Sequence, residues 1–289
     1  MADVVTVADI VSYALARAYG KLCASEPGML AGNDPEAIHD GRVATRRLRS
    51  DLRTFEPFLD RDWAQHLRGE LQWLTAELGD VRDVEVMRER LGHHAQAFSA
   101  SDADRVEHVL RRLDADREAA RMVLLSGLRS ARYAQVRSDL AAGVGAPPLR
   151  KRARRDARDE LGDIVHERWR KLARDVKRLG PAPSDGDLHH ARIRAKRCRY
   201  AAEACEPAFG KPARQFARVL ANVQDVLGEQ HDAVVAGAWL GKTAPECTPE
   251  DAYLLGRLAQ VQEVAAAAAR DEFLAMWPDV KRKQLRRWM

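Results

Sequence analysis

Five basic side chains recur at spacings of three and four residues within one short stretch of the chain: His39, Arg42, Arg46, Arg49 and Arg53. On an α-helix, at about 100° per residue, these spacings bring all five onto one face. Apolar residues of the same stretch fall beside them, so the helix would bury one side and carry cations along its edge. Guanidinium groups present paired N–H donors that match phosphate oxygens. The stretch therefore predicts a helix that binds a polyanion.

A second copy of this pattern follows 150 residues further along the chain. Its basic residues are His189, Arg192, Lys196 and Arg199. The copies differ at two places: Glu203 corresponds to Arg53, and Arg194 falls on the apolar side where the first copy has Ala44. A repeat of this length suits a duplicated half of domain size. We therefore expect two similar helical bundles related by an approximate twofold axis, with the two basic stripes facing each other.

Residues outside the stripes repeat at the same distance. Lys21 and Lys171 are also 150 residues apart, in the helix expected before each stripe. Each half thus offers one lysine beside its row of arginines and histidine. We expect the two lysines to close the same anion site.

A Leu-Gly-acid motif also occurs twice, at residues 78–80 and 227–229. Its glycines predict helix ends. Asp83 and Asp232 follow the two motifs at matching positions. We expect these aspartates, together with Glu203, to orient the arginines and reduce their mutual repulsion, and we favour this role over metal ligation.

The composition favours an all-α fold. Aromatic residues make up only 6% of the chain, Ala, Leu and Arg are abundant, and β-branched residues rarely alternate with polar ones. The Gly- and Pro-rich segment Ala142–Pro148 is the best internal boundary. It divides the chain into a first helical half, residues 1–142, and a second, residues 149–289.

Helix signals place the elements that carry the stripes. We expect a helix over Val4–Ser25, then a loop over Pro27–Asn33. Asp34 and Pro35 predict the N-cap and first residue of the first basic helix, which should end near Glu56. The other helices are expected at residues 62–78, 101–140 with a break near 126–127, 150–179, 188–206, 212–227 and from 250 onward.

Charge and cysteine usage narrow the class of protein. The net charge is only +5, from 48 basic and 43 acidic residues, so what matters is how cations are sorted onto particular faces. The four cysteines show no metal-type spacing and fit reduced core residues. No leader or membrane-spanning run is evident. We expect a cytoplasmic protein without metal or cofactor.

The length of a stripe indicates the shape of the ligand. Four helical turns span roughly 20 Å, which suits a linear chain of phosphates better than one small phosphate. Only Tyr200 interleaves the cations, so base stacking is poorly supported and nucleic acid is a disfavoured partner. The alternative remains a nucleic-acid-binding helical protein that uses the dense basic run Arg150–Arg158 and the C-terminal basic tail.

Four motifs in order resemble those of the CHAD domain, the conserved histidine α-helical domain. The first half supplies His39-x-x-Arg42 with Arg46-Arg47-x-Arg49, then the 78–83 motif Leu-Gly-Asp-Val-Arg-Asp. The second half supplies His189-x-x-Arg192 with residues 196–203, then Leu-Gly-x-x-His-Asp at 227–232. The resemblance covers nearly the whole chain. Within the family pattern, glutamate is ordinary at position 203.

This resemblance implies a function. It predicts two helical bundles around a basic central pore or groove that binds inorganic polyphosphate without catalysis, in a protein associated with polyphosphate granules. A triphosphate-tunnel hydrolase domain accompanies many relatives, and the strands it requires are not evident here. A second copy of the chain or granule-associated proteins are further candidate partners.

An enzymatic function is the least favoured alternative. The His-Asp pairs at 39–40 and 231–232 resemble those of metal-dependent phosphohydrolases, but His39 has no further metal ligands near it in the sequence. No Ser/His/Asp or Cys/His signature is evident. Whether Arg132 lines the site stays open from the sequence.

Overall fold

The computed structural model describes residues 5–32 and 34–289, and their regular structure is helical. The α-helices are α1 (Val7–Ala31), α2 (Pro35–Thr54), α3 (Arg61–Ala95), α4 (Ala100–Leu128), α5 (Ala131–Gly145), α6 (Ala157–Lys177), α7 (Asp185–Ala204), α8 (Glu206–Phe209), α9 (Lys211–Thr243) and α10 (Pro249–Val280). Four short 3-10 turns, η1 (Glu56–Phe58), η2 (Lys151–Arg154), η3 (Ala244–Glu246) and η4 (Lys283–Arg286), connect or follow them. The predicted all-α class is confirmed. No helix in the described residues is long and apolar enough to cross a membrane.

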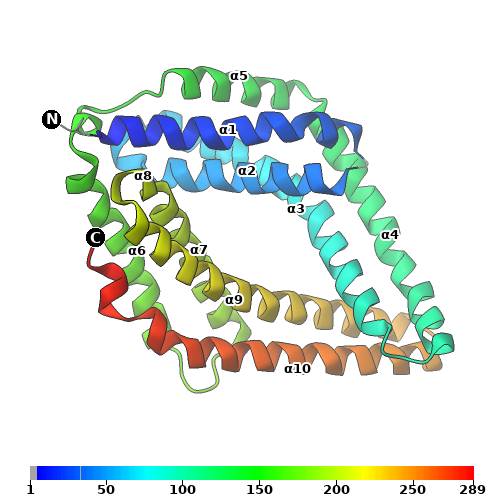
Figure 1. The fold of residues 1–289 in the computed structure, drawn as a ribbon. Helices are drawn as coiled ribbons and strands as arrows, with labels where there is room; N and C mark the ends of the chain where they lie inside the picture. The colour runs from blue at the N-terminus through cyan, green and yellow to red at the C-terminus, as the bar shows by residue number, and fades with distance from the viewer. Residues whose placement is uncertain (1–4, 33) are drawn as a thin grey trace.

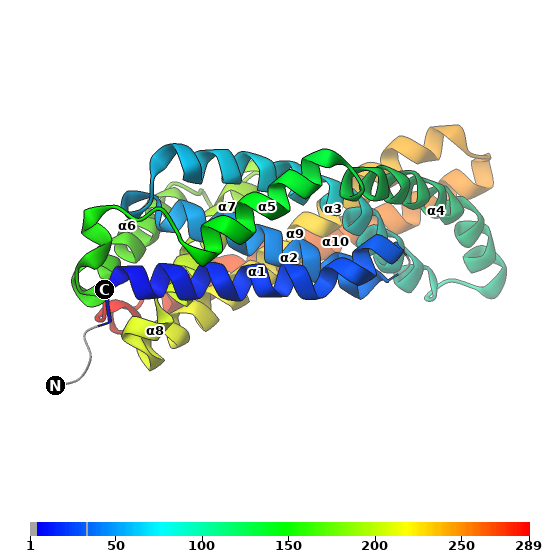
Figure 2. The same ribbon diagram turned by 90° about the horizontal axis from the view of Figure 1, so that it is seen from above.

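The helices form a ring with two points of closure. In Figure 1, α1 and α2 lie side by side, α9 and α10 run along the opposite side, and the long helices α3 and α4 form the far end. At one point α2 packs against α7; at the other, α3 contacts both α9 and α10, and α4 contacts α10. Figure 2 shows the same helices from above, with α5 lying along the α1 side. Both ends of the chain lie at the end of the molecule away from α4.

Two separate hydrophobic cores stabilise this ring. The larger surrounds the α2–α7 contact and includes Phe55, Phe58 and Phe216, which are fully buried. The smaller joins the ends of α3 and α4 to α9 and α10, through residues such as Leu91 and Leu240. Burial of apolar area drives both contacts, at roughly 25 cal/mol per Å². Between the two cores, the facing sides of α3 and α9 carry charged residues.

The start of the first basic helix follows the sequence signal. The Asp34 side chain accepts hydrogen bonds from the backbone N–H groups of Glu36 and Ala37, and Pro35 is the first helical residue. This confirms the predicted N-cap of the first basic helix. The second basic helix, α7, begins with a reciprocal capping box between Ser184 and Asp187.

The first helix is longer than predicted. It continues through Pro27, where the sequence predicts a loop, and ends at Gly32, whose left-handed backbone (φ 75°) lets its N–H donate to Gly28 O at 3.1 Å. Close packing explains the extension, because a Cβ atom at Gly28 would collide with Ala37 of α2. The contacts of α1 with α2 outweigh the one hydrogen bond that the proline removes.

The predicted helix ends at Gly79 and Gly228 are wrong. Both glycines lie inside long continuous helices, α3 and α9. A glycine costs an exposed helix only about 1 kcal/mol, and burial of Leu78 and Leu227 in the larger core favours continuation. The basic run also differs from prediction, since α6 begins only at Ala157 and most of the run forms η2 and extended backbone.

The first helix of one predicted half, α1, starts beside the first helix of the other, α6. Val7 N donates to Arg155 O at 3.0 Å, and Ala157 N donates to Val5 O at 2.9 Å. Residues of both halves contribute to the larger core. The division at 1–142 and 149–289 and the approximate twofold axis stay predictions.

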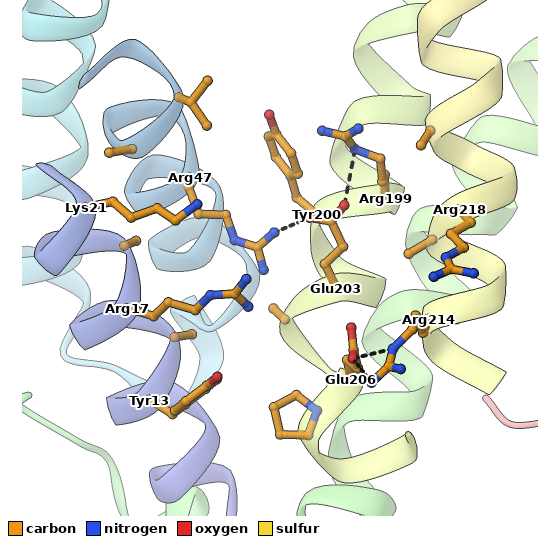
Figure 3. Close-up of a pocket in the computed structure, with 18 residues that line it drawn as sticks. Tyr13, Arg17, Lys21, Arg47, Arg199, Tyr200, Glu203, Glu206, Arg214 and Arg218 are labelled. Carbon is orange, nitrogen blue, oxygen red and sulfur yellow. Dashed lines mark hydrogen bonds and ion pairs between the residues drawn. The ribbon is translucent and has the colours of Figure 1, made fainter. Parts of the chain in front are cut away.

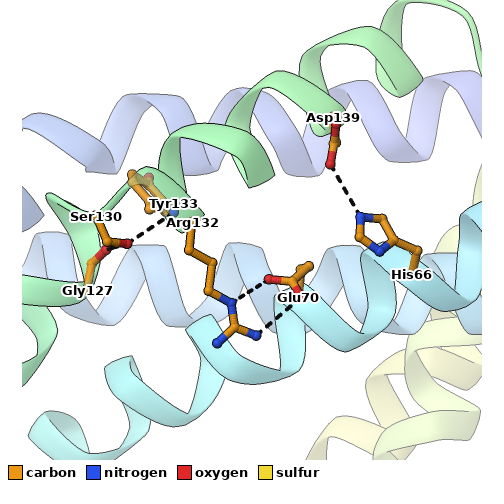
Figure 4. Close-up of polar contacts among 7 residues, drawn as sticks. All are labelled: His66, Glu70, Gly127, Ser130, Arg132, Tyr133 and Asp139. Carbon is orange, nitrogen blue, oxygen red and sulfur yellow. Dashed lines mark hydrogen bonds and ion pairs between the residues drawn. The ribbon is translucent and has the colours of Figure 1, made fainter.

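Polar contacts fix α5 against α3 on the outside of the bundle. Figure 4 shows Arg132 of α5 held by Glu70 at 2.7 and 3.2 Å, and His66 close to Asp139 at 3.3 Å. The Arg132 guanidinium also lies 4.3 Å from the centre of the Trp73 ring. Arg132 thus serves this helix contact and lines neither of the basic cavities described next.

Candidate functional site: a basic cavity between the two stripes

A cavity of about 380 Å³ lies where α2, α3, α7 and α9 surround the space between the two cores. We call it the central cavity. Six of its lining residues are cations: Arg42, Arg46, Arg49, Arg90, Arg192 and Lys196. Asp83 and Asp232 are the carboxylates in its lining, and His231 adds an imidazole. Both predicted stripes therefore contribute to one strongly basic cavity.

Arg42 and Arg192 occupy corresponding positions on α2 and α7. The Nε atom of each is buried and has no hydrogen-bond partner among the described residues. Arg42 also lies over Gly79 of α3, and Arg192 over Gly228 of α9, where a Cβ atom added to either glycine would meet the guanidinium at 3.8 and 4.0 Å. Asp83 holds Arg42 at 2.8 Å, the contact expected of a carboxylate that orients an arginine. Buried donors without partners carry a free-energy cost that an anion would remove.

Arg46 of the first stripe is half-buried. Burial lowers the pKa of its guanidinium; Tyr200 and Asp83 oppose this shift, and the nearby charges of Arg42 and Arg192 add to it. No carboxylate among residues 5–32 and 34–289 forms an ion pair with Arg46. The ligand-free cavity is therefore electrostatically strained.

Two histidines of the second half lie together at the cavity. The Nδ1 atoms of His189 and His231 are 3.3 Å apart, and their ring centres 4.7 Å. Burial lowers the pKa of both, and Arg192 lowers it further. Burial also raises the pKa of Asp232, against the effect of Arg192. Two neutral imidazoles close together can each gain a proton when an anion arrives.

The α2–α7 contact also lines a second cavity of about 380 Å³, shown in Figure 3, which we call the flanking cavity. Lys21 and Arg199, both predicted site residues, line this cavity and not the central one. The other cations around it are Arg17, Arg47, Arg214 and Arg218. The structure therefore divides the predicted residues between two cavities.

Carboxylates neutralise part of the flanking cavity. Glu203 forms ion pairs with Arg47 and, at 3.4 Å, with Arg199, while Glu206 binds Arg214. Asp51, fully buried, holds Arg47 from the other side at 3.1 Å. Arg47 and Arg199 also lie over the ring of Tyr200. Arg47, which lies outside the stripe, is thus an ion-pair residue.

Four predicted site residues line neither cavity: His39, Arg53, Lys171 and His189, the last of which contacts His231 of the central cavity. His39 lies half-buried near the start of α2. Lys171 of α6 forms an ion pair with Glu167 at 2.5 Å. Arg53 lies one turn beyond Arg49 on α2, among other arginines. The contact of His39 with the anion and the role of Lys171 in closing the site stay predictions.

Sequence reasoning missed two residues of the central cavity. Arg90 follows Asp83 by seven residues, which places both on one face of α3. Its guanidinium binds Glu229 at 2.8 and 2.7 Å. His231 takes the place of Arg82 in the repeat, so the spacing of the second Leu-Gly motif could have indicated it.

Some arginines of the basic run and of the C-terminal tail form contacts within the protein. Arg152 and Arg155 share Glu160, and Arg158 donates to Ala208 O at 3.0 Å. Arg286 of the tail lies 4.5 Å from the Trp169 ring centre, and Trp288 packs on Phe209. No group of three or more His, Cys, Asp or Glu side chains arranged to hold a metal occurs in the described part of the chain.

A family model for the CHAD domain matches residues 13–241, which contain both stripes and both Leu-Gly motifs. The chain belongs to the CHAD domain family. Two uncharacterized proteins of Mycobacterium tuberculosis, MT2285 of strain CDC 1551 and Rv2226 of strain H37Rv, are each 30% identical to it over 253 residues. These matches cover 83% of this chain and 47% of each relative, so the chain spans about half the length of the curated relatives it matches.

Two solved structures share the fold of this CHAD domain. PptA from Streptomyces chartreusis superposes with a TM-score of 0.82 and 24% identity, over 95% of this chain and all of PptA. The CHAD domain from the plant Ricinus communis gives 0.74 and 23% identity, over 95% of this chain and 91% of that one. At these identities the likeness establishes the fold and leaves the ligand to be argued from the site.

Proposed function

We propose that this CHAD domain binds inorganic polyphosphate in the central cavity without hydrolysing it. The observation that supports this most is the pair Arg42 and Arg192, whose buried Nε atoms have no partners among the described residues. Both line a cavity with six cations and two carboxylates in its lining. A flexible chain of phosphates offers an acceptor at each of these donors.

The shape of the site favours a linear anion. Its cations come from three helices, α2, α3 and α7, and continue along α2 and α7 beyond the cavity, to Arg53 on one and Arg199 on the other. A single phosphate could meet only a few of them. Association with polyphosphate granules, in the cytoplasm, is the cellular role that the family resemblance suggests.

A titration with polyphosphate at two salt concentrations tests the proposal. Because binding releases counterions, affinity should be high at low salt and fall steeply as salt rises. Long-chain polyphosphate should displace bound RNA or DNA far better than the reverse, which distinguishes it from the nucleic-acid alternative. Phosphate release with added divalent metal would indicate a phosphohydrolase, and a lack of measurable binding would refute the proposal.

His231 in the lining of the central cavity and its neighbour His189 predict a pH dependence. In the free protein the pKa of His189 and His231 lies below the ordinary 6.5, so both are neutral near pH 7. A bound polyanion stabilises the imidazolium form and raises these pKa values. Binding then takes up protons, so affinity should increase as the pH falls from about 7 to about 5.

Calorimetry in buffers of different ionisation enthalpy measures this proton uptake. Replacing His189 and His231 by glutamine should flatten the pH profile. Protonation of Asp232, whose pKa is raised, acts in the same direction and would leave a smaller slope. An unchanged profile in the double variant would show that the histidines do not sense the ligand.

A further inference from the structure

Five half-buried arginines gather beyond one end of the central cavity: Arg49, Arg53, Arg68, Arg168 and Arg197. We call them the arginine cluster. They come from α2, α3, α6 and α7. Arg49 belongs to the cluster and also lines the central cavity, so the two are continuous.

Internal contacts hold the cluster in place but leave most of its charge uncompensated. Arg168 Nη2 donates to the backbone O of Arg53 at 3.2 Å, and Arg49 donates to Gln72 at 3.1 Å. Among residues 5–32 and 34–289, Glu56 is the one carboxylate that forms an ion pair with it, to Arg68 at 3.1 Å. Burial and then Arg197, ahead of the other arginines, lower the pKa of Arg53 to about 10.

The repeat shows that this accumulation is not a requirement of the fold. Arg53 and Arg197 correspond, at an offset of 150 residues, to Glu203 and Arg47. On that side the equivalent pair is an Arg47–Glu203 ion pair, reinforced by Asp51. At corresponding places in the repeat, one pair of residues therefore carries opposite charges and the other pair carries like charges.

Repulsion among half-buried guanidinium groups destabilises the ligand-free protein, and an anion would remove that cost. Arg42, Arg46, Arg49 and Arg53 follow one another along a single face of α2, so a phosphate chain bound by the first three meets the cluster next. We propose that the arginine cluster is a second phosphate-binding site, where a polyphosphate chain too long for the central cavity continues past Arg49. The polyphosphate chain extends along the side of the arginine cluster in preference to the side of Glu203. This inference rests on the proposed function.

Charge reversal at Arg53 tests the inference. The Arg53→Glu variant puts a glutamate among the four remaining arginines. A glutamate already stands at the corresponding position of the repeat, 203. Its affinity for long-chain polyphosphate should fall about tenfold or more, since a charged hydrogen-bonding group is both lost and opposed. Its affinity for tripolyphosphate, short enough for the central cavity alone, should change by less than about twofold after screening by salt.

Arg218→Glu is the matched control. Arg218 is exposed in the flanking cavity beside Glu203, corresponds to Arg68 in the repeat, and undergoes the same change of charge. It should lower long-chain affinity by less than about threefold. Equal losses in the two variants, or unchanged long-chain affinity in Arg53→Glu, would overturn the inference while leaving binding in the central cavity intact.

Circular dichroism and thermal melting check the fold of each variant. Arg53→Glu should melt no lower than the wild type, because it adds ion pairs to the cluster. Should it not fold, Arg197→Gln makes the same comparison with a milder change. If the wild type bound neither tripolyphosphate nor long chains, the proposed function itself would fail, which is a distinct result.

Discussion

Replacing Arg42 and Arg192 together by alanine should lower polyphosphate affinity by at least about a hundredfold. Each hydrogen bond to a charged group contributes roughly 1.5–3 kcal/mol, so two arginines supply about 3–6 kcal/mol. Each tenfold in affinity corresponds to about 1.4 kcal/mol. Both guanidinium groups are already positioned, Arg42 by Asp83 at 2.8 Å, so little ordering cost offsets the gain. Titration at fixed salt and pH measures the loss.

The helical content of this double variant should stay unchanged, because both side chains project into the cavity and not into either core. The matched control is Arg132→Ala, which removes a cation from the outer face of the bundle. Its affinity should equal that of the wild type. If the double variant also bound normally, the assignment of the central cavity would be wrong.

Arg46→Met should make the ligand-free protein more stable while weakening polyphosphate binding. Burial of a guanidinium without an ion-pair partner costs free energy, and methionine fills a similar volume without a charge. Replacing buried charges by apolar groups stabilises proteins by about 1–4 kcal/mol, which raises Tm by roughly 2–4 °C for each kcal/mol in a chain of this size. Affinity should fall about tenfold or more.

The Arg90→Met variant distinguishes the relief of charge repulsion at Arg46 from a general effect on stability of removing a positive charge. Arg90 lines the same cavity but is paired with Glu229, so its loss leaves a carboxylate unpaired and brings no gain in Tm. A Tm for Arg46→Met at or below the wild type would show that the cavity is not strained. Such an outcome would weaken the argument that an anion belongs in it.

A stability gain at Arg46 would also explain why the cavity retains its charge. Residues selected for packing alone would not leave six cations with two carboxylates between two hydrophobic cores. The stability lost to repulsion in the free protein returns as affinity when a polyanion binds. Added polyphosphate should therefore raise the Tm of the wild type more than that of the Arg46→Met variant.

Local signals in the sequence determined the helical class, the stripes and the start of the first basic helix. The stripe on α2 follows from the 3.6-residue period, and the Asp34 N-cap follows from hydrogen bonds between near neighbours. The 150-residue offset by itself also pairs Arg42 with Arg192. These features depend on residues close in sequence or on the repeat, so no knowledge of the tertiary contacts was required.

Only the tertiary structure decided where each helix ends and which cations meet. Gly79 and Gly228 stay helical because burial of neighbouring leucines outweighs their weak helix propensity, and Pro27 stays helical because α1 packs tightly on α2. Lys21 of α1 and Arg199 of α7 line the flanking cavity and not the central one, and this depends on how α1, α2 and α7 pack together. A helical period states which residues share a face, and the partner packed against that face determines whether its charges are paired or remain free for a ligand.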